Sequence, residues 1–289
     1  MPCYRWQNRT ERVEIVKVSG YVPCFNNQVT LTTALGSLLA QGLAPGDVFV
    51  VDDASTDDSV AVARSLNVEV KVNPRNCGRG YTRARAMREA GHELVLACDA
   101  TKKLAPDFLA IALKWMDSPK VAAVFGRVVR NHQSSAVERW ESRHIFKENS
   151  PGVTNNRASL ATGGVLMRRS SILQAGNFKD SLRHSEDIDL GNRLLAAGFK
   201  VVFDPTLRIM QVGRTRFWSL MERYWRWHAG PEERTSVRHY LRMISYSVKV
   251  LAREDWAVRD YTGVPISLFV PHYQFWRSFC RGLRRSANC

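Results

Sequence analysis

Short apolar segments alternate with helical ones through the first half of the chain. Predicted strands cover residues 13–22, 48–51 ("VFVV"), 68–72 ("VEVKV") and 93–98 ("ELVLAC"). Between them lie apolar residues at helical spacing, such as Leu31, Leu35 and Leu38, and a further helix begins at Pro106. This alternation predicts an α/β fold, with a Rossmann-like, mostly parallel mixed sheet flanked by helices and ligands bound at the carboxyl ends of the strands.

Polar side chains follow three of the predicted strands. Asn26 comes after the first strand, Asp52 and Asp53 after the second, and Asp99 after the fourth. One carboxylate of the Asp52–Asp53 pair could accept the imide N–H of a nucleobase while the other caps the following helix. Turn and cap chemistry alone explains either aspartate equally well.

Composition limits the size of the fold and the kind of partner. With 289 residues, of which 45% are hydrophobic, the chain can bury one large core or a core with an appendage. Its 42 Lys and Arg residues against 27 Asp and Glu residues give a net charge of +15, which favours anionic partners. No nucleic-acid motif is visible, so we expect no nucleic-acid partner. The six scattered cysteines predict neither a zinc site nor a disulfide framework.

The two ends of the chain bear on localisation. Charged residues occupy the N-terminal stretch where a signal peptide needs an apolar run, and no stretch reaches the roughly 18 apolar residues of a membrane span. We therefore expect a cytoplasmic protein. The segment 260–285 combines aromatic residues, an apolar patch and arginines. That composition is typical of a peripheral segment on an anionic surface, such as the inner face of the cell membrane, and equally typical of a helix packed on the domain.

The second half mixes predicted strands ("VAAVFGRVV", "ATGGVLM", "KVVFD", "LRIMQV") with helices, the clearest of which runs from Ser185 to Gly198. From Phe217 the chain becomes aromatic, basic and helical. We divide it into a domain covering residues 1–213 and a C-terminal helical extension covering residues 214–289.

Four stretches occur in the order that they have in a known family: "VPCFNN", "VVDDASTDDS", "CDATKK" and "TGGVLMRRSSILQAGNFKDSLRHSEDIDLGNRLLAAGFK". Through them, the chain resembles the inverting family 2 glycosyltransferases, which have the nucleotide-binding glycosyltransferase A fold. A fifth stretch, "RYWRW", is similar to the family's Gln-x-x-Arg-Trp element, with Arg223 in place of Gln. The resemblance runs from about Val13 to His228 and makes residues 1–213 a nucleotide-sugar-binding catalytic domain.

The resemblance implies a general base in "SEDIDL". Ser185 is the expected N-cap, which places Glu186 and Asp187 in the first helical turn, where the helix dipole favours carboxylates. Alternatively, the two carboxylates could do no more than interact favourably with the helix dipole. In the family, the Asp of this pair is the base, which matches Asp187, and inversion needs one base to take the acceptor hydroxyl proton as its oxygen attacks the anomeric carbon.

Further residues are implied as ligand contacts. Those expected at the nucleotide are Pro23, Phe25, Asn26, Asp52, Asp53, Arg83 and Asp99. Those expected at the acceptor or the sugar are Gly163, Gly164, Trp225 and Trp227. A solvated basic helix explains Arg83 equally well, a packing strand explains the glycines, and a packed or membrane-facing helix explains the tryptophans.

The metal ligands of the family are incomplete. The resemblance implies Mn²⁺ or Mg²⁺ on the last Asp of an Asp-x-Asp motif and on a downstream His, but these positions hold Thr101 and Gln211. Asp99 alone remains, so we expect a weakly bound metal or none. Four cations are candidates to stabilise the diphosphate instead: Lys102, Lys103, Arg223 and Arg226. Lysines that face solvent, beside a weak metal on Asp99, are the alternative.

The expected function is transfer of a sugar from a nucleotide-diphosphate donor to a hydroxyl group of a glycan or lipid-linked acceptor. UDP is favoured because it is the commonest donor nucleotide of the family. The alternative is a catalytically silent nucleotide-binding or scaffold protein of the same fold, which Asp187→Asn would distinguish from an enzyme.

Overall fold

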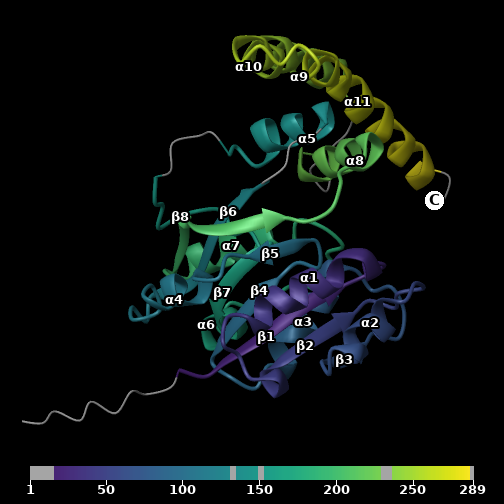
Figure 1. Cartoon of the computed structure of the whole chain (residues 1–289). Helices are drawn as coiled ribbons and strands as arrows, with labels where there is room; N and C mark the ends of the chain where they lie inside the picture. Colours follow the sequence, from purple (N-terminus) through teal and green to yellow (C-terminus); the bar gives the residue numbers. More distant parts are fainter. Residues whose placement is uncertain (1–15, 131–134, 149–152, 229–235, 287–289) are drawn as a thin grey trace, which may run out of the picture.

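The computed structural model describes residues 16–130, 135–148, 153–228 and 236–286, without the side chains of His228 and of residues 281–286. In these residues, a central sheet of eight strands has the order β3-β2-β1-β4-β7-β6-β8-β5 (Figure 1). A layer of helices lies beyond one end of this sheet (Figure 1).

The first half of the sheet is parallel, as predicted. Strand β1 (Val18–Cys24) pairs in parallel with β2 (Val48–Asp52) on one side and with β4 (Leu94–Cys98) on the other. Strand β3 (Glu69–Val72) pairs in parallel with the outer edge of β2. Helices α1 (Gln28–Leu39), α2 (Ser59–Ser65) and α3 (Arg79–Glu89) connect them, with a short 3₁₀ turn at Pro45–Asp47. The strand predicted over residues 13–22 begins later, at Val18, and residues 13–15 of it lie outside the described part.

The second half of the sheet is mixed. Strands β6 (Val121–Val129) and β8 (Lys200–Gln211) are parallel to each other, β7 (Gly164–Arg168) is antiparallel to β4 and β6, and β5 (Lys102–Leu104) is antiparallel to β8. The connecting helices are α4 (Phe108–Leu113), α6 (Arg169–Gln174) and α7 (Glu186–Ala196). "KVVFD" and "LRIMQV" form the single strand β8 rather than two strands, and β5 was not predicted.

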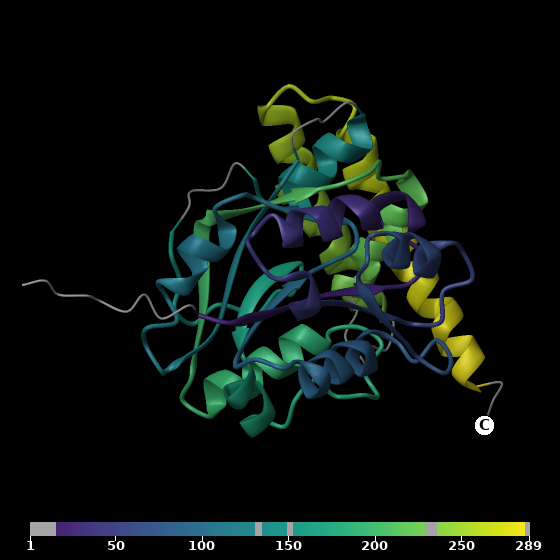
Figure 2. The same ribbon diagram turned by 60° about the horizontal axis from the view of Figure 1, so that its bottom comes forward.

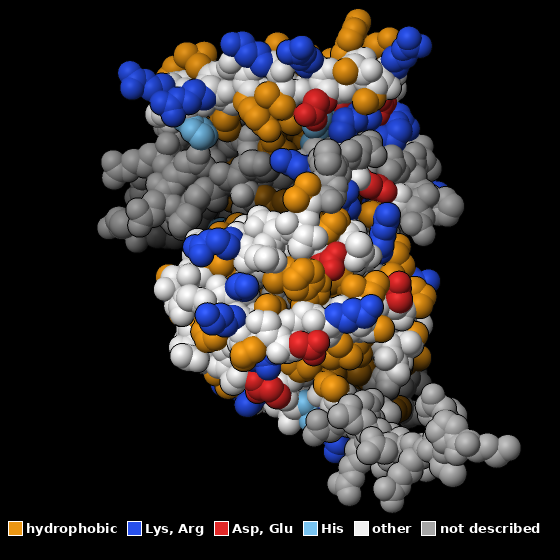
Figure 3. Space-filling model, turned by 90° about the vertical axis from the view of Figure 1, so that its left-hand side faces the viewer, with side chains coloured by type: hydrophobic (Ala, Val, Ile, Leu, Met, Phe, Trp, Pro, Cys, Tyr) orange, Lys and Arg blue, Asp and Glu red, His pale blue; other side chains and the backbone are white. Residues whose placement is uncertain are grey.

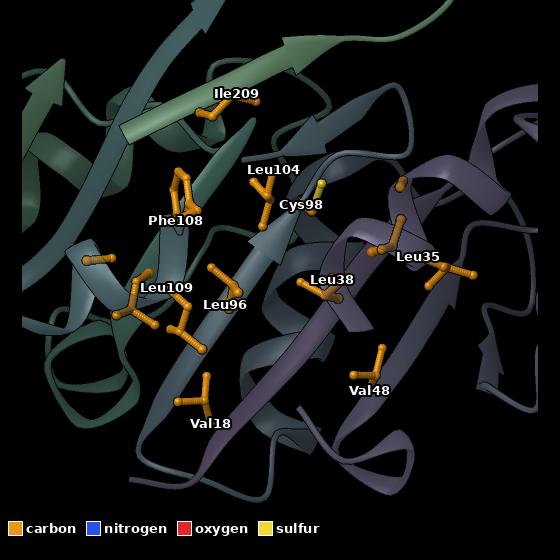
Figure 4. Packing of buried hydrophobic residues seen from close by; sticks show 14 of the residues in the cluster. Val18, Leu35, Leu38, Val48, Leu96, Cys98, Leu104, Phe108, Leu109 and Ile209 are labelled. Atoms are coloured by element: carbon orange, nitrogen blue, oxygen red, sulfur yellow. The ribbon is translucent and has the colours of Figure 1, made fainter. Parts of the chain in front are cut away.

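Two apolar cores cover the two faces of the sheet. Figure 4 shows the first, in which Leu35 and Leu38 of α1 and Phe108 of α4 meet side chains of β1, β2 and β4. The second core packs α3, α6 and α7 on the opposite face, and Figure 2 shows these helices on one side of the sheet with α1 on the other. The layered α/β architecture follows directly from the apolar strands, whose residues are buried on both faces.

The helical layer has a core of its own. It contains α5 (Ala136–Trp140), the π-turn η2 (Glu141–Ile145), α8 (Phe217–His228), α9 (Val237–Tyr246), the π-turn η3 (Ser247–Ala252), α10 (Arg253–Ala257) and α11 (Val264–Ser286). Trp140 is fully buried there against α8 and α11, and its Nε1 donates to Ser267 Oγ at 2.8 Å. Residues 136–145 therefore join the layer that the sequence division assigned to residues 214–289 alone.

No helix in the described part of the chain combines the length and apolar character needed to cross a membrane.

Candidate active site

A pocket of about 490 Å³ opens at the carboxyl ends of β1, β2 and β4. The sheet order changes direction here, because β1 lies between β2 and β4, and such switch points are where open α/β sheets bind ligands. The volume lies within the usual range for small-molecule sites, roughly 300–1,000 Å³. The lining residues are Pro23, Cys24, Phe25, Asn27, Asp53, Asn76, Gly78, Arg79, Thr82, Arg83, Asp99, Ala100, Thr101, Arg183, His184 and Arg226.

Arg83 connects the pocket to the helix that carries the predicted base. Its Nη2 donates to Asp99 Oδ1 at 2.6 Å, and its Nε donates to Glu186 Oε1 at 3.1 Å. Burial alone would raise the pKa of Asp99, but Arg83, Arg79 and Lys102 hold it below its usual value. The third guanidinium nitrogen, Nη1, is buried without a hydrogen-bond partner among the described residues. Arg83 therefore fixes two carboxylates at the base of the pocket.

Positive charge dominates the pocket wall. Arg79, Arg83, Arg183 and Arg226 line it, against the carboxylates of Asp53 and Asp99. Among the described residues, neither Arg79 nor Arg226 has an ion-pair partner, and burial and the neighbouring arginines lower the pKa of Arg226. An anionic ligand would relieve this repulsion.

Arg183 and His184 are pocket residues that sequence reasoning missed. They immediately precede the Ser185 cap and the Glu186–Asp187 pair, and Arg183 bonds the side chain of Asn76 across the pocket mouth. Their position before the first turn of a helix was the signal available in the sequence, because such loops approach anionic ligands.

Asp52 and Asp53 have different environments. Asp52 accepts hydrogen bonds from the amide and the hydroxyl group of Ser55, at 2.8 and 2.5 Å, and these bonds stabilise the turn that follows β2. Asp53 lines the pocket and accepts bonds from the amides of Cys77 and Gly78, at 2.8 Å each, so it shapes the loop before α3. The prediction that one of them caps α2 is wrong, because the cap position is Asp58 and Asp57 bonds the amide of Ser59.

The motif after β1 lies at the pocket edge. Pro23 and Phe25 line it, whereas Asn26 adopts a left-handed conformation (φ 52°) and ties the β1 loop to the β2 loop. Its amide donates to Ser55 Oγ at 2.9 Å, and its Oδ1 accepts from the Thr56 amide at 2.8 Å. The place of Asn26 is therefore that of a positioning residue.

Glu186 and Asp187 have different environments. Glu186 is buried and holds Arg83, whereas Asp187 is only partly buried and has no ion-pair partner among the described residues. Burial and the adjacent Glu186 carboxylate raise the pKa of Asp187 to about 6. Ser185 stands at the cap position as expected, but it is left-handed (φ 60°) and makes no capping hydrogen bond with its side chain.

The residues in the expected metal positions do not form a metal site. Asp99 already bonds Arg83, Thr101 offers a neutral hydroxyl group, and Gln211 Oε1 accepts a bond from the Lys102 ammonium. Within the described residues, no group of three His, Cys, Asp or Glu side chains could hold a metal ion. A cation already placed among these ligands would repel a dication, so the donor set does not fit Mn²⁺ or Mg²⁺.

The remaining candidate cations differ in position. Lys102 is buried, whereas Lys103 is its neighbour on the same strand, points to the other face and is exposed, which removes it from the site. Arg223 bonds the buried Glu141. Burial, and after it the nearby Arg223, lower the pKa of Lys102 to about 7, so an anionic ligand is needed to keep this lysine fully charged at neutral pH. Arg226 lines the pocket.

The two tryptophans differ in their exposure to solvent, and the two glycines differ in their surroundings. Trp225 is buried in the helical layer, where its Nε1 donates to Ser278 Oγ at 2.9 Å, so it cannot stack on a sugar and that assignment is corrected. Trp227 is 51% exposed. Gly164 serves packing, because a Cβ there would lie 2.8 Å from Leu104 and Ile209. Gly163 faces Asp99 and Lys102 instead.

Comparison with known proteins shows the family of the chain. Residues 19–176 match the family described as Glycosyl transferase family 2. The chain belongs to this family. This family 2 glycosyltransferase is 27% identical over 216 residues to an N-acetylglucosaminyltransferase of Rhizobium leguminosarum bv. viciae, covering 66% of this chain and 50% of that protein. It is 30% identical over 196 residues to the succinoglycan biosynthesis protein ExoU of Rhizobium meliloti, covering 60% and 56%.

The fold of this family 2 glycosyltransferase is also found in solved structures. The mannosyltransferase PcManGT from Pyrobaculum calidifontis, in complex with GDP-Man and Mn²⁺, superposes with a TM-score of 0.54 at 17% identity, over 90% of this chain and 69% of that one. The predicted glycosyltransferase A fold is thereby confirmed. The prediction of an enzyme is confirmed by the match to a glycosyltransferase family. The chain spans about half the length of the curated relatives that it matches.

Proposed function

We propose that this enzyme is an inverting glycosyltransferase that uses a nucleotide-diphosphate sugar, with UDP as the favoured nucleotide. The nucleotide would lie against Pro23, Phe25 and Asp53, with its diphosphate toward Arg79, Arg83 and Arg226. The Asp187 carboxylate takes the proton of the acceptor hydroxyl group as its oxygen attacks the anomeric carbon. The bond from that carbon to the diphosphate oxygen breaks, and the electron pair leaves with the diphosphate.

The observation that carries this proposal is the contrast between the two acids at the start of α7. Glu186 is committed to Arg83, whereas Asp187 has a raised pKa and no ion pair among the described residues. A carboxylate in this state, close to an arginine-lined pocket, is suited to general-base chemistry.

The proposal predicts the pH dependence of turnover. Because the base must be ionised and the pKa of Asp187 is about 6, kcat should fall about tenfold per pH unit below that value and level off above it. The measurement is nucleotide release at a series of pH values with UDP-N-acetylglucosamine and GDP-mannose as donors and a panel of sugar and lipid-linked acceptors. Rates that stay constant from pH 7 down to pH 4.5 would contradict the assignment of the base.

We further propose that the acceptor is a glycan or a lipid-linked sugar and that the helical layer contacts an anionic membrane surface. Of the 19 exposed large hydrophobic residues in the described part of the chain, 13 lie between Trp218 and Phe279. Helix α9 has no buried residue, and Val237, Leu241 and Val248 form an exposed stripe at helical spacing that continues into η3. This arrangement is typical of an interfacial helix.

Charge beside the stripe favours anionic lipid. From residue 236 to residue 260, the exposed charged side chains are Arg238, Arg242, Lys249, Arg253, Arg259 and Glu254. Figure 3 shows blue Lys and Arg side chains beside orange hydrophobic ones on this layer. In the tail proposed from sequence, Arg277 instead bonds Glu222, and the side chains of Arg281, Arg284 and Arg285 lie outside the described residues.

Membrane contact can be measured by vesicle co-sedimentation. Because each basic residue near an anionic surface contributes about 1 kcal/mol, Arg238→Ala with Arg242→Ala should weaken binding to phosphatidylserine vesicles roughly 30-fold. Lys114→Ala with Lys120→Ala removes the same charge from exposed sites elsewhere and should have little effect. Equal losses in both pairs, or no binding by the wild type, would refute membrane contact through α9.

A further inference from the structure

The Lys102 side chain is buried, and the residue before it, Thr101, lines the pocket described above. Lys102 lies on β5 directly opposite Gln211 of β8, and this register places the two side chains on the same face. Nζ donates to Gln211 Oε1 and lies 4.7 Å from the centroid of the Phe146 ring. Gly163 lies beside this side chain, because a Cβ there would be in van der Waals contact with Lys102 Cε at 3.6 Å and Asp99 Oδ2 at 3.8 Å.

The buried Lys102 ammonium has fewer hydrogen-bond and ion-pair partners than a buried charge normally has. An ammonium has three N–H donors, but among the described residues it has one hydrogen-bond acceptor, a neutral amide, and no carboxylate within ion-pair distance. Arg223 and Arg130 add repulsion, which Asp99 and Glu141 offset from farther away. Burying a charge in this way is costly unless a ligand supplies the missing counter-charge.

We propose that the Lys102 ammonium, positioned by Gln211 and Phe146, is a resident cation that neutralises the departing diphosphate in place of a divalent metal ion. This inference rests on the proposed function and deepens it. Two observations support the location: Lys102 bonds the residue in one expected metal-ligand position, and it directly follows Thr101, which occupies the other and lines the pocket.

The charges of the reaction balance without a metal. Cleavage of the bond between the anomeric carbon and the diphosphate oxygen leaves one more negative charge on the diphosphate, while the acceptor proton passes to Asp187. One ammonium gives half the attraction of a dication at the same distance, and Arg79 and Arg226 on the pocket wall add to it.

The first experiment uses UDP and GDP as probes in titration calorimetry of the full chain, in EDTA and in Mn²⁺. We expect the wild type to bind one of them equally well in both buffers. Lys102→Met keeps the length and the packing of the side chain while removing its charge, so it should fold and should bind that nucleotide about 10- to 100-fold more weakly. Lys103→Met removes the adjacent exposed lysine and should bind like the wild type.

Three outcomes of this experiment would overturn the inference. Wild-type binding that requires Mn²⁺, or a Lys102→Met variant that binds as tightly as the wild type, shows that the ammonium does not replace the metal. A wild type that binds neither nucleotide in either buffer refutes the proposed function, and the inference with it. The first two outcomes leave the nucleotide site intact, so the two failures can be told apart.

A second variant tests the location directly. It combines three substitutions. Thr101→Asp and Gln211→His supply a carboxylate and an imidazole ligand beside Asp99, and Lys102→Ala removes the competing positive charge. We expect this triple variant to bind the nucleotide at least tenfold more tightly in Mn²⁺ than in EDTA. Binding that is the same in both buffers would show that the ammonium does not stand in the position of a metal.

Discussion

Asp187→Asn should lower kcat by about 10²- to 10⁴-fold while leaving the affinity for the donor nucleotide unchanged. The substitution preserves the shape of the side chain and its place beside the Glu186–Arg83 pair, but an amide cannot accept the acceptor's proton. The measurement is steady-state transfer at pH 8, where the wild-type carboxylate is ionised, together with calorimetric nucleotide binding.

Asp189→Asn is the matched control, because it makes the same change two residues later on α7. Asp189 is bonded to Lys179 and Arg193, both at 2.7 Å, on the outer side of the helix. Its loss should cost stability and leave kcat within a factor of two or so. Equal effects of the two substitutions on kcat would show that α7 acts through its fold and that Asp187 is not the base.

Arg83→Ala should be among the most destabilising single substitutions in the chain. Both Arg83 and Glu186 have side chains that are 3% exposed, so removing the guanidinium leaves the buried Glu186 carboxylate, and the partly exposed Asp99 beside it, without a counter-charge. Such a loss typically costs 3–5 kcal/mol, which corresponds to a fall in Tm of roughly 10 °C for a domain of this size. The measurement is thermal unfolding at neutral pH, accompanied by nucleotide binding, which should also be lost.

Arg88→Ala gives the control on the same helix. Arg88 and its partner Asp180 are about half-exposed and 3.5 Å apart, so this pair should contribute less than about 1 kcal/mol. Adding Glu186→Gln to Arg83→Ala should recover part of the lost stability, because it removes one of the uncompensated charges. A Tm that falls by less than about 3 °C in Arg83→Ala would mean that water enters and solvates Asp99 and Glu186.

The sequence was a good guide where structure depends on local pattern. Apolar strands with helices between them predict the parallel half of the sheet, and of the polar residues at the strand ends Asp53 and Asp99 line one pocket, whereas Asn26 and Asp52 hold the loops beside it. Pairing over long separations could not be predicted in this way. Whether Lys102 or Lys103 faces inward depends on the register of a three-residue strand with β8, more than a hundred residues later.

Helix orientation produced the other errors. Trp225 and Trp227 are separated by about 200° around α8, so only one of them can face the layer's core, and the choice depends on how α8 packs. Arg223 was assigned to the diphosphate through its place in the "RYWRW" stretch, and nothing in the sequence reveals its partner, Glu141, on a π-turn 82 residues earlier. A buried acid in a short irregular helix leaves no periodic signal.

Glu141 also bears on how separable the parts of this chain are. Its carboxylate accepts bonds from Arg130 Nη2 at 2.6 Å, from Thr215 Oγ1 at 2.8 Å and from Arg223, which come from the end of β6, the segment after β8 and helix α8. Trp140 beside it is fully enclosed by the helical layer. If the chain ended at residue 213, the remaining fragment would therefore keep the Glu141 carboxylate and the Trp140 indole but lose the side chains that bury them. The layer is consequently not an exchangeable module: a recombined chain that received a different one would have to inherit residues 136–145 along with it.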